Sequence, residues 1–459
     1  MSEKVDAIVV GAGIGGSIVG AYLAKGGLKT VVFEKAANVG GYKYGSYKLG
    51  EITTDNHCHV PMLYFSLNGG NGWWAKAAAE VGAPLQWQAL PNPHFYFRGN
   101  LVRMPFCTSG EAFVDFITGM MPLPDDAKKG LAKVFDDAIN MPEEVLWSRE
   151  MTEMPFQKWL AERTDNELVK QLFNVLNDIS IVGATMEASV TCTMSVMIAF
   201  LAGWLNLTYM ANGTAEELPK SFGRVVTKHG GQILLEHTVE KVIIENGRAK
   251  GVVVKDREGK EKTYEAKYVI VNASYDILDK ILGLGNAMPK EITEACQSMN
   301  RANEVALDVH FALKKRIAHP TGSQIVVIDD NMQFQGSILY PDVWVPSLAP
   351  AGKQLIQTEK FMTRAEFETR TIDEWKTFMR DLVETVFPGF KDEIEFEQAH
   401  VKYAPAGYYI FYYGPKVPVE CPGIPNLFFT GDYTQAGGFC TDRAAASAMV
   451  ATKKILGTI

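Results

Sequence analysis

A glycine-rich turn followed by a carboxylate is the first group of residues that could do chemistry. A short apolar run from Ala7, which we expect to be a strand, ends in the pattern G-x-G-x-x-G at Gly11, Gly13 and Gly16. Glycines at this spacing allow a tight turn and a close approach of the backbone to a pyrophosphate, which the start of the next helix attracts. Glu34 follows roughly 20 residues later and can accept hydrogen bonds from ribose hydroxyls. This order predicts a dinucleotide site.

Further glycines bear on which dinucleotide binds. NAD needs little beyond the first unit, whereas FAD must also be held along its ribityl chain and isoalloxazine ring. The pair Gly40-Gly41 follows Glu34, and near the end of the chain a strand-like run reaches Gly431-Asp432. The pair Gly437-Gly438 and an expected alanine-rich helix over residues 443–455 come next.

Together these motifs resemble the flavin amine oxidase and phytoene desaturase superfamily. The stretch Gly431–Thr434 is most similar to plant-type phytoene and zeta-carotene desaturases, and the resemblance covers most of the chain, with specific ends and a generic middle. It implies an FAD-dependent oxidoreductase of α/β class (α+β overall), with a Rossmann-like FAD-binding domain and an interleaved substrate domain of mixed sheet plus helices. The FAD-binding domain would comprise residues 1–65, 212–290 and 420–459, and the substrate domain residues 66–211 and 291–419.

The resemblance also implies a set of cofactor-binding residues. Asp432 would orient FAD near the pyrophosphate and ribityl chain, Val239 would hold the adenine by main-chain contacts, and the last helix would point its N-terminus at the flavin pyrimidine. Thr441 or Asp442 is the expected N-cap of that helix. The full set is Gly11, Gly13, Gly15, Gly16, Glu34, Lys35, Gly40, Gly41, Val239, Gly431, Asp432, Gly438 and Thr441.

Two departures from the family pattern are candidate catalytic residues. Arg443 stands where relatives have Glu, and because a cation in a first helical turn opposes the helix dipole, we expect a compensating anion. That anion would be a neighbouring carboxylate or a group on substrate or cofactor. His57 stands where relatives have Gly, and on an extended strand it shares one face with His59.

The two histidines have two interpretations. They would transfer a proton or orient the substrate, because imidazole titrates near neutral pH, or they would be hydrogen-bonded walls of a polar pocket. A metal site is not expected, since no third ligand is visible nearby. Residues expected to line an apolar substrate cavity are Tyr408, Tyr409, Phe411 and Tyr433.

These residues lead to three enzyme hypotheses. The first is hydride transfer between flavin N5 and a hydrophobic small molecule, isoprenoid-like or oxygenated, because buried imidazole and guanidinium groups suit a carbonyl, carboxylate or hydroxyl. The second is a redox-neutral flavin-dependent isomerase or hydratase. The third, an amine oxidase, is less favoured because no lysine lies in 302–313 and Thr441 replaces an aromatic residue. A flavin-binding module without activity is the remaining alternative.

Composition constrains the partners. The net charge of −8 leaves no basic surplus for nucleic acid, and the six cysteines lie far apart, so neither disulfides nor a thiolate metal site is expected. The short polar start before the first strand leaves no room for a signal peptide, so we expect a cytoplasmic protein, with peripheral membrane contact as an alternative. The electron acceptor would be a quinone, oxygen or another protein.

Hydrophobic periodicity predicts the remaining elements. Helices are expected over 111–121, 125–140, 155–162, 166–178 and 364–386, and strands over 305–313 and 324–328, with a β-meander over 231–273. The uncharged segment 188–215 is interrupted by polar residues, so a buried helix is expected there in preference to a membrane-touching surface.

The FAD is predicted to be non-covalent, because no cysteine or histidine lies in a recognised linkage context. Acid precipitation of the purified protein should therefore release all of the flavin into the supernatant, measured by absorbance. Yellow colour retained in the pellet would contradict this.

Overall fold

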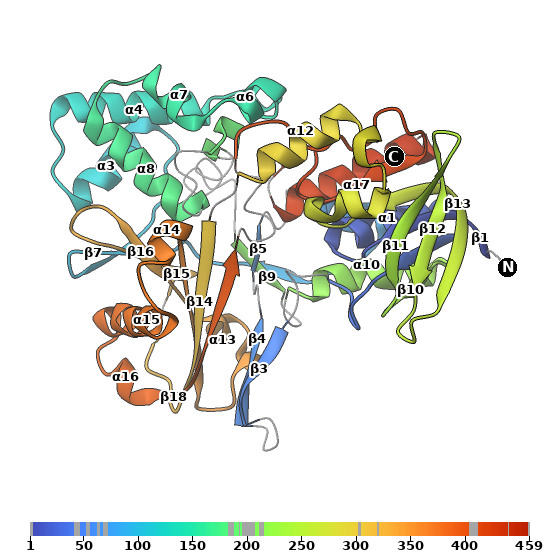
Figure 1. Cartoon of the computed structure of the whole chain (residues 1–459). Coiled ribbons are helices and arrows are strands. Elements are labelled where there is room, and N and C mark those ends of the chain that lie inside the picture. Colours follow the sequence, from blue (N-terminus) through green and yellow to red (C-terminus); the bar gives the residue numbers. More distant parts are fainter. Residues whose placement is uncertain are drawn as a thin grey trace.

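The structure is a computed structural model. It describes residues 3–40, 46–51, 56–61, 65–67, 72–181, 188–191, 193–194, 207–210, 215–301, 304–318, 321–403, 412–438 and 440–457. Figure 1 shows one sheet with its helices on one side of the molecule and a second sheet with its helices on the other.

The first sheet combines the two ends of the chain. Its order is β10-β2-β1-β13-β12-β11, with β19 also paired to β13, and β10, β2, β1, β13 and β19 run parallel. The bounds are β1 Glu3–Val10, β2 Thr30–Phe33, β10 Gln232–Leu234, β11 Thr238–Glu245, β12 Arg248–Lys255, β13 Glu261–Val271 and β19 Leu427–Phe429. This confirms the predicted meander. β1 begins earlier than Ala7, because Glu3 already pairs with Tyr264 of β13.

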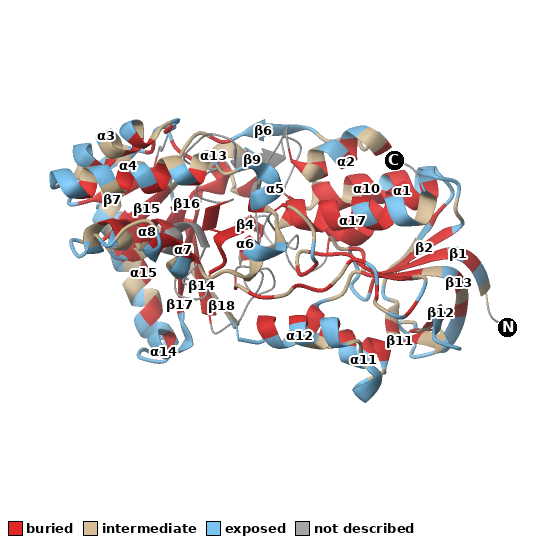
Figure 2. Cartoon of the chain, turned by 90° about the horizontal axis from the view of Figure 1, so that it is seen from above, coloured by how far each residue is buried: buried red, intermediate tan, exposed pale blue. Residues whose placement is uncertain are grey.

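Helices cover this sheet. α1 (Ile14–Lys25) packs against α10 (Glu217–Lys228) and α17 (Thr441–Leu456), and α2 (Trp73–Val81) packs against α1 and α17. Small residues such as Gly20 and Ala21 allow this close packing, and α1, α10 and α17 form a largely buried group in Figure 2. Two further helices, α11 (Leu278–Leu282) and α12 (Lys290–Met299), follow β13.

The second sheet has the order β18-β14-β17-β16-β15-β7-β8. Its strands are β7 His94–Phe97, β8 Asn100–Arg103, β14 Glu304–Leu313, β15 Gln324–Ile328, β16 Phe334–Leu339, β17 Gln354–Thr363 and β18 Ile394–Tyr403. Alternate residues of β14, including Leu307 and Val309, pack with Trp375 and Met379 of α15 (Ile372–Val386). The opposite face of the sheet therefore carries the other residues of β14.

The single helix predicted over 364–386 is wrong. The chain forms α14 (Arg364–Phe367) and then α15, because Thr371 and Glu374 make a reciprocal capping box that starts a new helix. Two short helices, α13 (Pro341–Trp344) and α16 (Phe390–Glu393), lie in the connections of this sheet.

A helical layer follows β8. The predicted helices are confirmed as α3 Gly110–Met120, α4 Asp125–Ile139, α7 Phe156–Ala161 and α8 Glu167–Ile181, and the sequence did not predict α5 Glu143–Leu146 or α6 Arg149–Glu153. Much of the segment 188–215 lies outside the described residues. Leu207–Met210 is strand β9, which pairs with β5 (Phe65–Leu67) and β6 (Trp87–Ala89), so a helix there is wrong.

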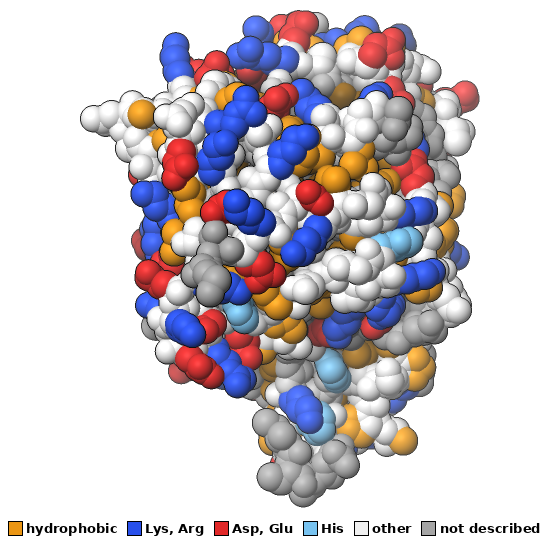
Figure 3. Space-filling view, turned by 90° about the vertical axis from the view of Figure 1, so that its right-hand side faces the viewer, with side chains coloured by type: hydrophobic (Ala, Val, Ile, Leu, Met, Phe, Trp, Pro, Cys, Tyr) orange, Lys and Arg blue, Asp and Glu red, His pale blue; other side chains and the backbone are white. Residues whose placement is uncertain are grey.

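A hairpin lies over one end of the second sheet. β3 (Ser46–Glu51) and β4 (Asn56–Pro61) pair antiparallel, and Leu49, Cys58 and Val60 pack on Ala312 and Leu355 of the sheet. Within the described part of the chain, no helix is long and apolar enough to cross a membrane. Acidic and basic side chains are interspersed over the face in Figure 3.

Candidate flavin site

The glycine loop between β1 and α1 is built around close backbone approaches. Gly11 has φ +95°, and a Cβ there would lie 2.3 Å from the carbonyl oxygen of Asn272. A Cβ on Gly16 would lie 1.9 Å from the Gly11 carbonyl oxygen, and one on Gly13 would lie 2.9 Å from Asn272 Oδ1. The loop therefore requires glycine for steric reasons. Gly13 is the N-cap of α1 and offers no side chain to cap it.

Asn272, which the sequence patterns did not single out, holds three strand ends together. Its backbone N–H donates to the Val10 carbonyl at 2.8 Å, and its Nδ2 donates to the Thr430 carbonyl at 2.7 Å. The only local signal for it was a polar residue directly after the apolar run of β13.

Glu34 is buried at the end of β2 and contacts the glycine loop. Its Oε2 accepts the Ala12 N–H at 2.8 Å and its Oε1 accepts the Ala36 N–H at 2.9 Å. Each carboxylate oxygen can accept a further hydrogen bond, so the group is fixed in place and can still receive ribose hydroxyls.

Other predicted cofactor residues lie around Glu34. Lys35 is exposed, and the Gly40 N–H donates to the Ala12 carbonyl at 3.0 Å. Val239 is buried in β11, two residues beyond His237, whose N–H donates to the Glu34 carbonyl at 2.9 Å. Gly41 lies outside the described residues.

The two ends of the chain meet at Gly431. A Cβ on Gly15 would lie 3.3 Å from the Gly431 nitrogen and 3.3 Å from the Ala444 carbonyl oxygen. The Gly431 N–H donates to Ser447 Oγ of α17 at 3.0 Å, and Asp432 follows at the partly exposed edge. The structure thus brings the predicted N-terminal and C-terminal cofactor residues together.

The start of α17 differs from the prediction. Cys440 is the N-cap, with φ +46°, and Thr441 is the first helical residue, so the N-cap predicted at Thr441 or Asp442 is wrong. The side chain of Asp442 instead accepts the Trp74 N–H at 3.3 Å. Cys440 makes no side-chain cap hydrogen bond at the helix start.

Arg443 is 2% exposed in this first turn. Its Nε donates to the Gly438 carbonyl at 3.0 Å, while its Nη1 is buried without a hydrogen-bond partner among the described residues. No salt bridge joins Arg443 to a carboxylate of the same described part of the chain. A buried guanidinium N–H without an acceptor is costly, so this geometry favours an acceptor on a bound group.

The predicted histidines lie on the face of the hairpin turned away from the second sheet. His59 Nε2 lies 2.7 Å from Ser46 Oγ, which donates to Glu216 Oε1 at 2.5 Å, and Glu216 also pairs with Lys220 at 2.6 Å. Burial alone would raise the pKa of Glu216, but hydrogen bonds from Lys220 and Ser46 hold it below its ordinary value. Nδ1 of His57 is buried without a partner among the described residues.

The structure describes one of the four residues predicted to line the substrate cavity. Tyr408, Tyr409 and Phe411 lie outside the described residues. Tyr433 is 2% exposed, packs in the core and donates its hydroxyl to the Val271 carbonyl at 3.3 Å, so the structure shows it in a packing position.

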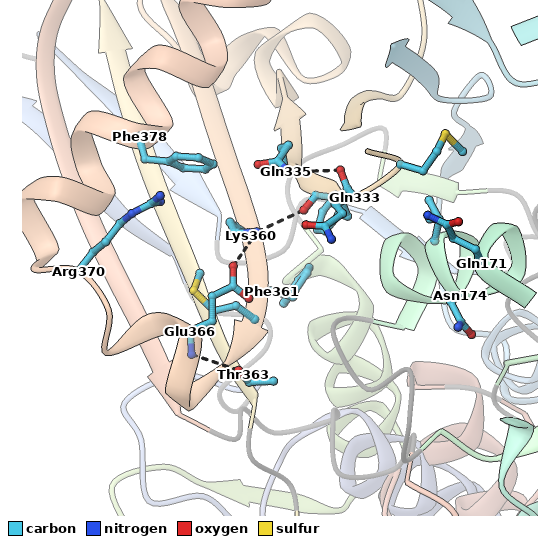
Figure 4. Close-up of a pocket in the computed structure, with 14 residues that line it drawn as sticks. Gln171, Asn174, Gln333, Gln335, Lys360, Phe361, Thr363, Glu366, Arg370 and Phe378 are labelled. Carbon is cyan, nitrogen blue, oxygen red and sulfur yellow. Dashed lines mark hydrogen bonds and ion pairs between the residues drawn. The ribbon is translucent and has the colours of Figure 1, made fainter. Parts of the chain in front are cut away.

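A separate pocket of about 450 Å³ lies where β16 begins and β17 ends in the second sheet (Figure 4). Gln171 and Asn174 of α8 face Lys360 of β17 across it, and Arg370 lies beside Phe378. None of the predicted site residues lines it. The part of the chain that is described holds no cluster of three His, Cys, Asp or Glu suited to a metal ion.

Known proteins match this chain along most of its length. A family model described as "Flavin containing amine oxidoreductase" matches residues 18–456. The chain belongs to this family. The match confirms the expected superfamily, the FAD cofactor and the FAD-dependent oxidoreductase class.

Individual relatives are more distant. The chain is 26% identical to prolycopene isomerase of Daucus carota, covering 82% of this chain and 63% of that protein. It is 22% identical to all-trans-retinol 13,14-reductase of Danio rerio, covering 59% of this chain and 47% of that protein. An oxidoreductase structure from Methanosarcina mazei, 17% identical, superposes with a TM-score of 0.72 over 98% of this chain and 100% of that one, which confirms the fold class.

The residues present fit FAD. The glycine loop leads into the start of α1, which has no side-chain cap, and Glu34 is fixed at the end of β2. Arg443 Nη1 is a buried donor without a partner among the described residues. The loop and helix start suit a pyrophosphate, Glu34 suits a ribose, and Arg443 suits a hydrogen-bond acceptor on the bound group.

Glu34→Ala should lower FAD affinity by roughly ten- to a hundredfold. The ribose hydroxyls and two loop N–H groups would each lose the carboxylate that accepts their hydrogen bonds, at a cost of about 1–3 kcal/mol. Flavin titration of the deflavinated protein measures this, and Asp432→Ala should behave similarly. Glu245→Ala, at an exposed end of β11, is the control and should bind normally. Equal flavin occupancy in Glu34→Ala and wild type would refute the assigned role.

Proposed function

We propose that the protein transfers hydride between flavin N5 and a hydrophobic small molecule that is oxygenated or isoprenoid-like. The observation that carries this proposal is Arg443, whose Nη1 is buried beside the glycine-built site without an acceptor among the described residues. A pure hydrocarbon would leave this donor unpaired, whereas a carbonyl, carboxylate or hydroxyl oxygen would accept from it.

Bound flavin supplies the hydride acceptor and donor at N5. The chain's own residues would do the rest. Arg443 would donate a hydrogen bond to an oxygen of the substrate or the flavin, and His57 and His59 would hold or move a proton on the same side of the hairpin. The contact from His59 through Ser46 to the Glu216 carboxylate fixes the imidazole ring.

A redox-neutral isomerase is the second candidate function. The Daucus carota relative is named as an isomerase and the Danio rerio relative as a reductase, so the relatives of this chain include both kinds of enzyme. The same polar residues would serve either reaction. An amine oxidase is less favoured, since Lys402, on the strand beside β14, is engaged in an ion pair with Asp308.

Anaerobic mixing of the oxidised protein with terpenoid, fatty-acyl, cyclic ketone, alcohol and amine compounds separates these functions. Bleaching of the flavin with oxidised product supports net hydride transfer, and so does reoxidation of reduced flavin by an unsaturated carbonyl. Isomerised product without a change in flavin absorbance would assign the redox-neutral reaction. Bleaching by amines alone would overturn the proposal.

His59→Ala and His57→Ala should lower turnover by about a hundredfold while FAD stays bound, if either imidazole transfers a proton. His229→Ala, at the exposed end of α10, is the control. Wild-type turnover in both variants, with flavin retained, would return the two histidines to a pocket-wall role.

Arg443→Met should mainly raise KM, because the guanidinium would bind the oxygen in the ground state and the transition state alike. Arg443→Lys, which keeps the charge and a donor, should recover part of the affinity. The flavin midpoint potential is measured in parallel. A lower potential with unchanged KM would place the acceptor on the flavin, and no change in either would remove Arg443 from the site.

A further inference from the structure

A polar row crosses the middle of the second sheet on the face opposite α15. Glu359 of β17 lies directly across from Asp308 of β14, which in turn lies across from His400 of β18. Ser337 of β16 is the other neighbour of Glu359. Directly opposed residues project from the same face of a sheet, so these side chains share one surface.

Only one of the two carboxyl groups has a counter-ion among the described residues. Lys402 of β18 pairs with Asp308 Oδ2, while Asp308 Oδ1 is buried without a hydrogen-bond partner. No hydrogen bond or ion pair reaches the carboxyl group of Glu359 from the described part of the chain. The row therefore has two carboxyl groups and one cation.

The neighbours of Glu359 add no second positive charge. His310 contacts the Tyr47 hydroxyl at 2.6 Å, and burial, with His400 and Lys402 nearby, holds its pKa well below the ordinary value. Burial likewise lowers the pKa of His400. Burial, and then the charge of Asp308, raise the pKa of Glu359 to about 8, against the opposing effect of Lys402. Ser337 and Tyr47 are uncharged at neutral pH, so Glu359 is protonated there.

The elements packed on this face of the sheet leave the polar row partly exposed. The β3–β4 hairpin packs on the Ala312 and Leu355 end, and toward the other edge Phe95 of β7 packs on Phe116 of α3. Between these elements, the side chains of Glu359, on the inner strand β17, and of His400, on the edge strand β18, are half-buried. The exposed part of Glu359, on the inner strand β17, is therefore open to solvent or to a ligand.

The polar row lies near the strand that carries the predicted histidines. Gln357 Nε2 donates to the Pro61 carbonyl at 3.0 Å, and Pro61 ends the strand that carries His57 and His59. Glu359 follows Gln357 on the same face, about 7 Å farther along the strand.

We infer that Glu359 is a general acid of the substrate site and that the substrate is a hydrophobic conjugated carbonyl compound. The inference rests on the proposed hydride transfer. The neutral carboxyl group of Glu359 donates a hydrogen bond to the carbonyl oxygen, and the charge of Asp308, which pairs with Lys402, favours the protonated form of Glu359.

The step balances as a reduction. Hydride from reduced flavin forms a C–H bond at an electrophilic carbon conjugated with the carbonyl. The displaced π electron pair ends on the carbonyl oxygen, which forms an O–H bond with the Glu359 proton. Glu359 is left as a carboxylate and regains a proton from water.

The protonation state is tested without turnover. Infrared difference spectra of the holoenzyme between pH 6 and pH 10 should show a protonated carboxyl band that disappears with a midpoint near pH 8 and is absent in Glu359→Gln. Asp308→Asn should lower that midpoint and Lys402→Met should raise it, because they remove opposite charges. Absence of such a band from wild type overturns the inference.

The role in binding and catalysis is tested with β-ionone, a conjugated terpenoid ketone. Its C=O stretch should shift to lower frequency on binding to wild type and to Glu359→Gln, which keeps a donor, and should shift clearly less with Glu359→Leu. During reduction, Glu359→Gln should keep KM and lose about a hundredfold in kcat. The rate of wild type should fall above about pH 8, and that of Asp308→Asn should fall at lower pH.

Glu397→Gln is the matched control. Glu397 lies on β18 but pairs with Arg380 and Lys376 on the α15 side, so its loss should change neither the pH profile nor the infrared band. A wild-type kcat in Glu359→Gln, or a β-ionone band indifferent to Glu359, overturns the inference. Bleaching by other substrates would still support the proposed function in that case, and failure of every substrate to exchange hydride would remove the proposed function by itself.

Discussion

The approach of the glycine loop to Asn272 is the constraint on which the flavin site depends. Because a Cβ on Gly11 would lie only 2.3 Å from the Asn272 carbonyl oxygen, no other residue type fits there. The same asparagine bonds Val10 and Thr430, so the ends of β1, β13 and β19 are held at one point. Gly431 and the start of α17 follow from that point, and with them the position of Arg443. Parallel strands present their carboxyl ends at one edge, where ligands of such sheets bind.

The β3–β4 hairpin connects this edge to the second sheet. Its apolar face packs on Ala312 and Leu355, and its polar face reaches Glu216 at the start of α10 through Ser46 and His59. A two-residue period lets one short strand serve both contacts. The hairpin thus places the histidines between the flavin-binding residues and the polar row of the second sheet.

Local patterns predicted much of this structure. The first βαβ unit, the meander and most helices of the layer α3 to α8 were readable because their signals lie within a few residues of one another. The division between α14 and α15 was also local, since Thr371 and Glu374 form a capping signature, but an apolar period running through both segments concealed it.

Contacts between distant residues were not readable in the same way. Asn272 looks ordinary in sequence, and its importance comes from Gly11 and Thr430. The alternation in β14 places Asp308 and His310 on one face, yet nothing local indicates that Glu359 and Lys402 lie beside them. Strand β9 was mistaken for helix because its partners, β5 and β6, lie more than a hundred residues earlier.

The strand order of the first sheet also has a consequence for biosynthesis. β1 leaves the ribosome long before its neighbour β13, which ends at Val271, and before β19, which ends at Phe429. Until those segments emerge, one edge of β1 has no partner, and contacts of such long sequence separation form slowly. The nucleotide pocket therefore closes only after β19 has been made, so flavin is incorporated late, and the nascent strand β1 needs protection from aggregation until then.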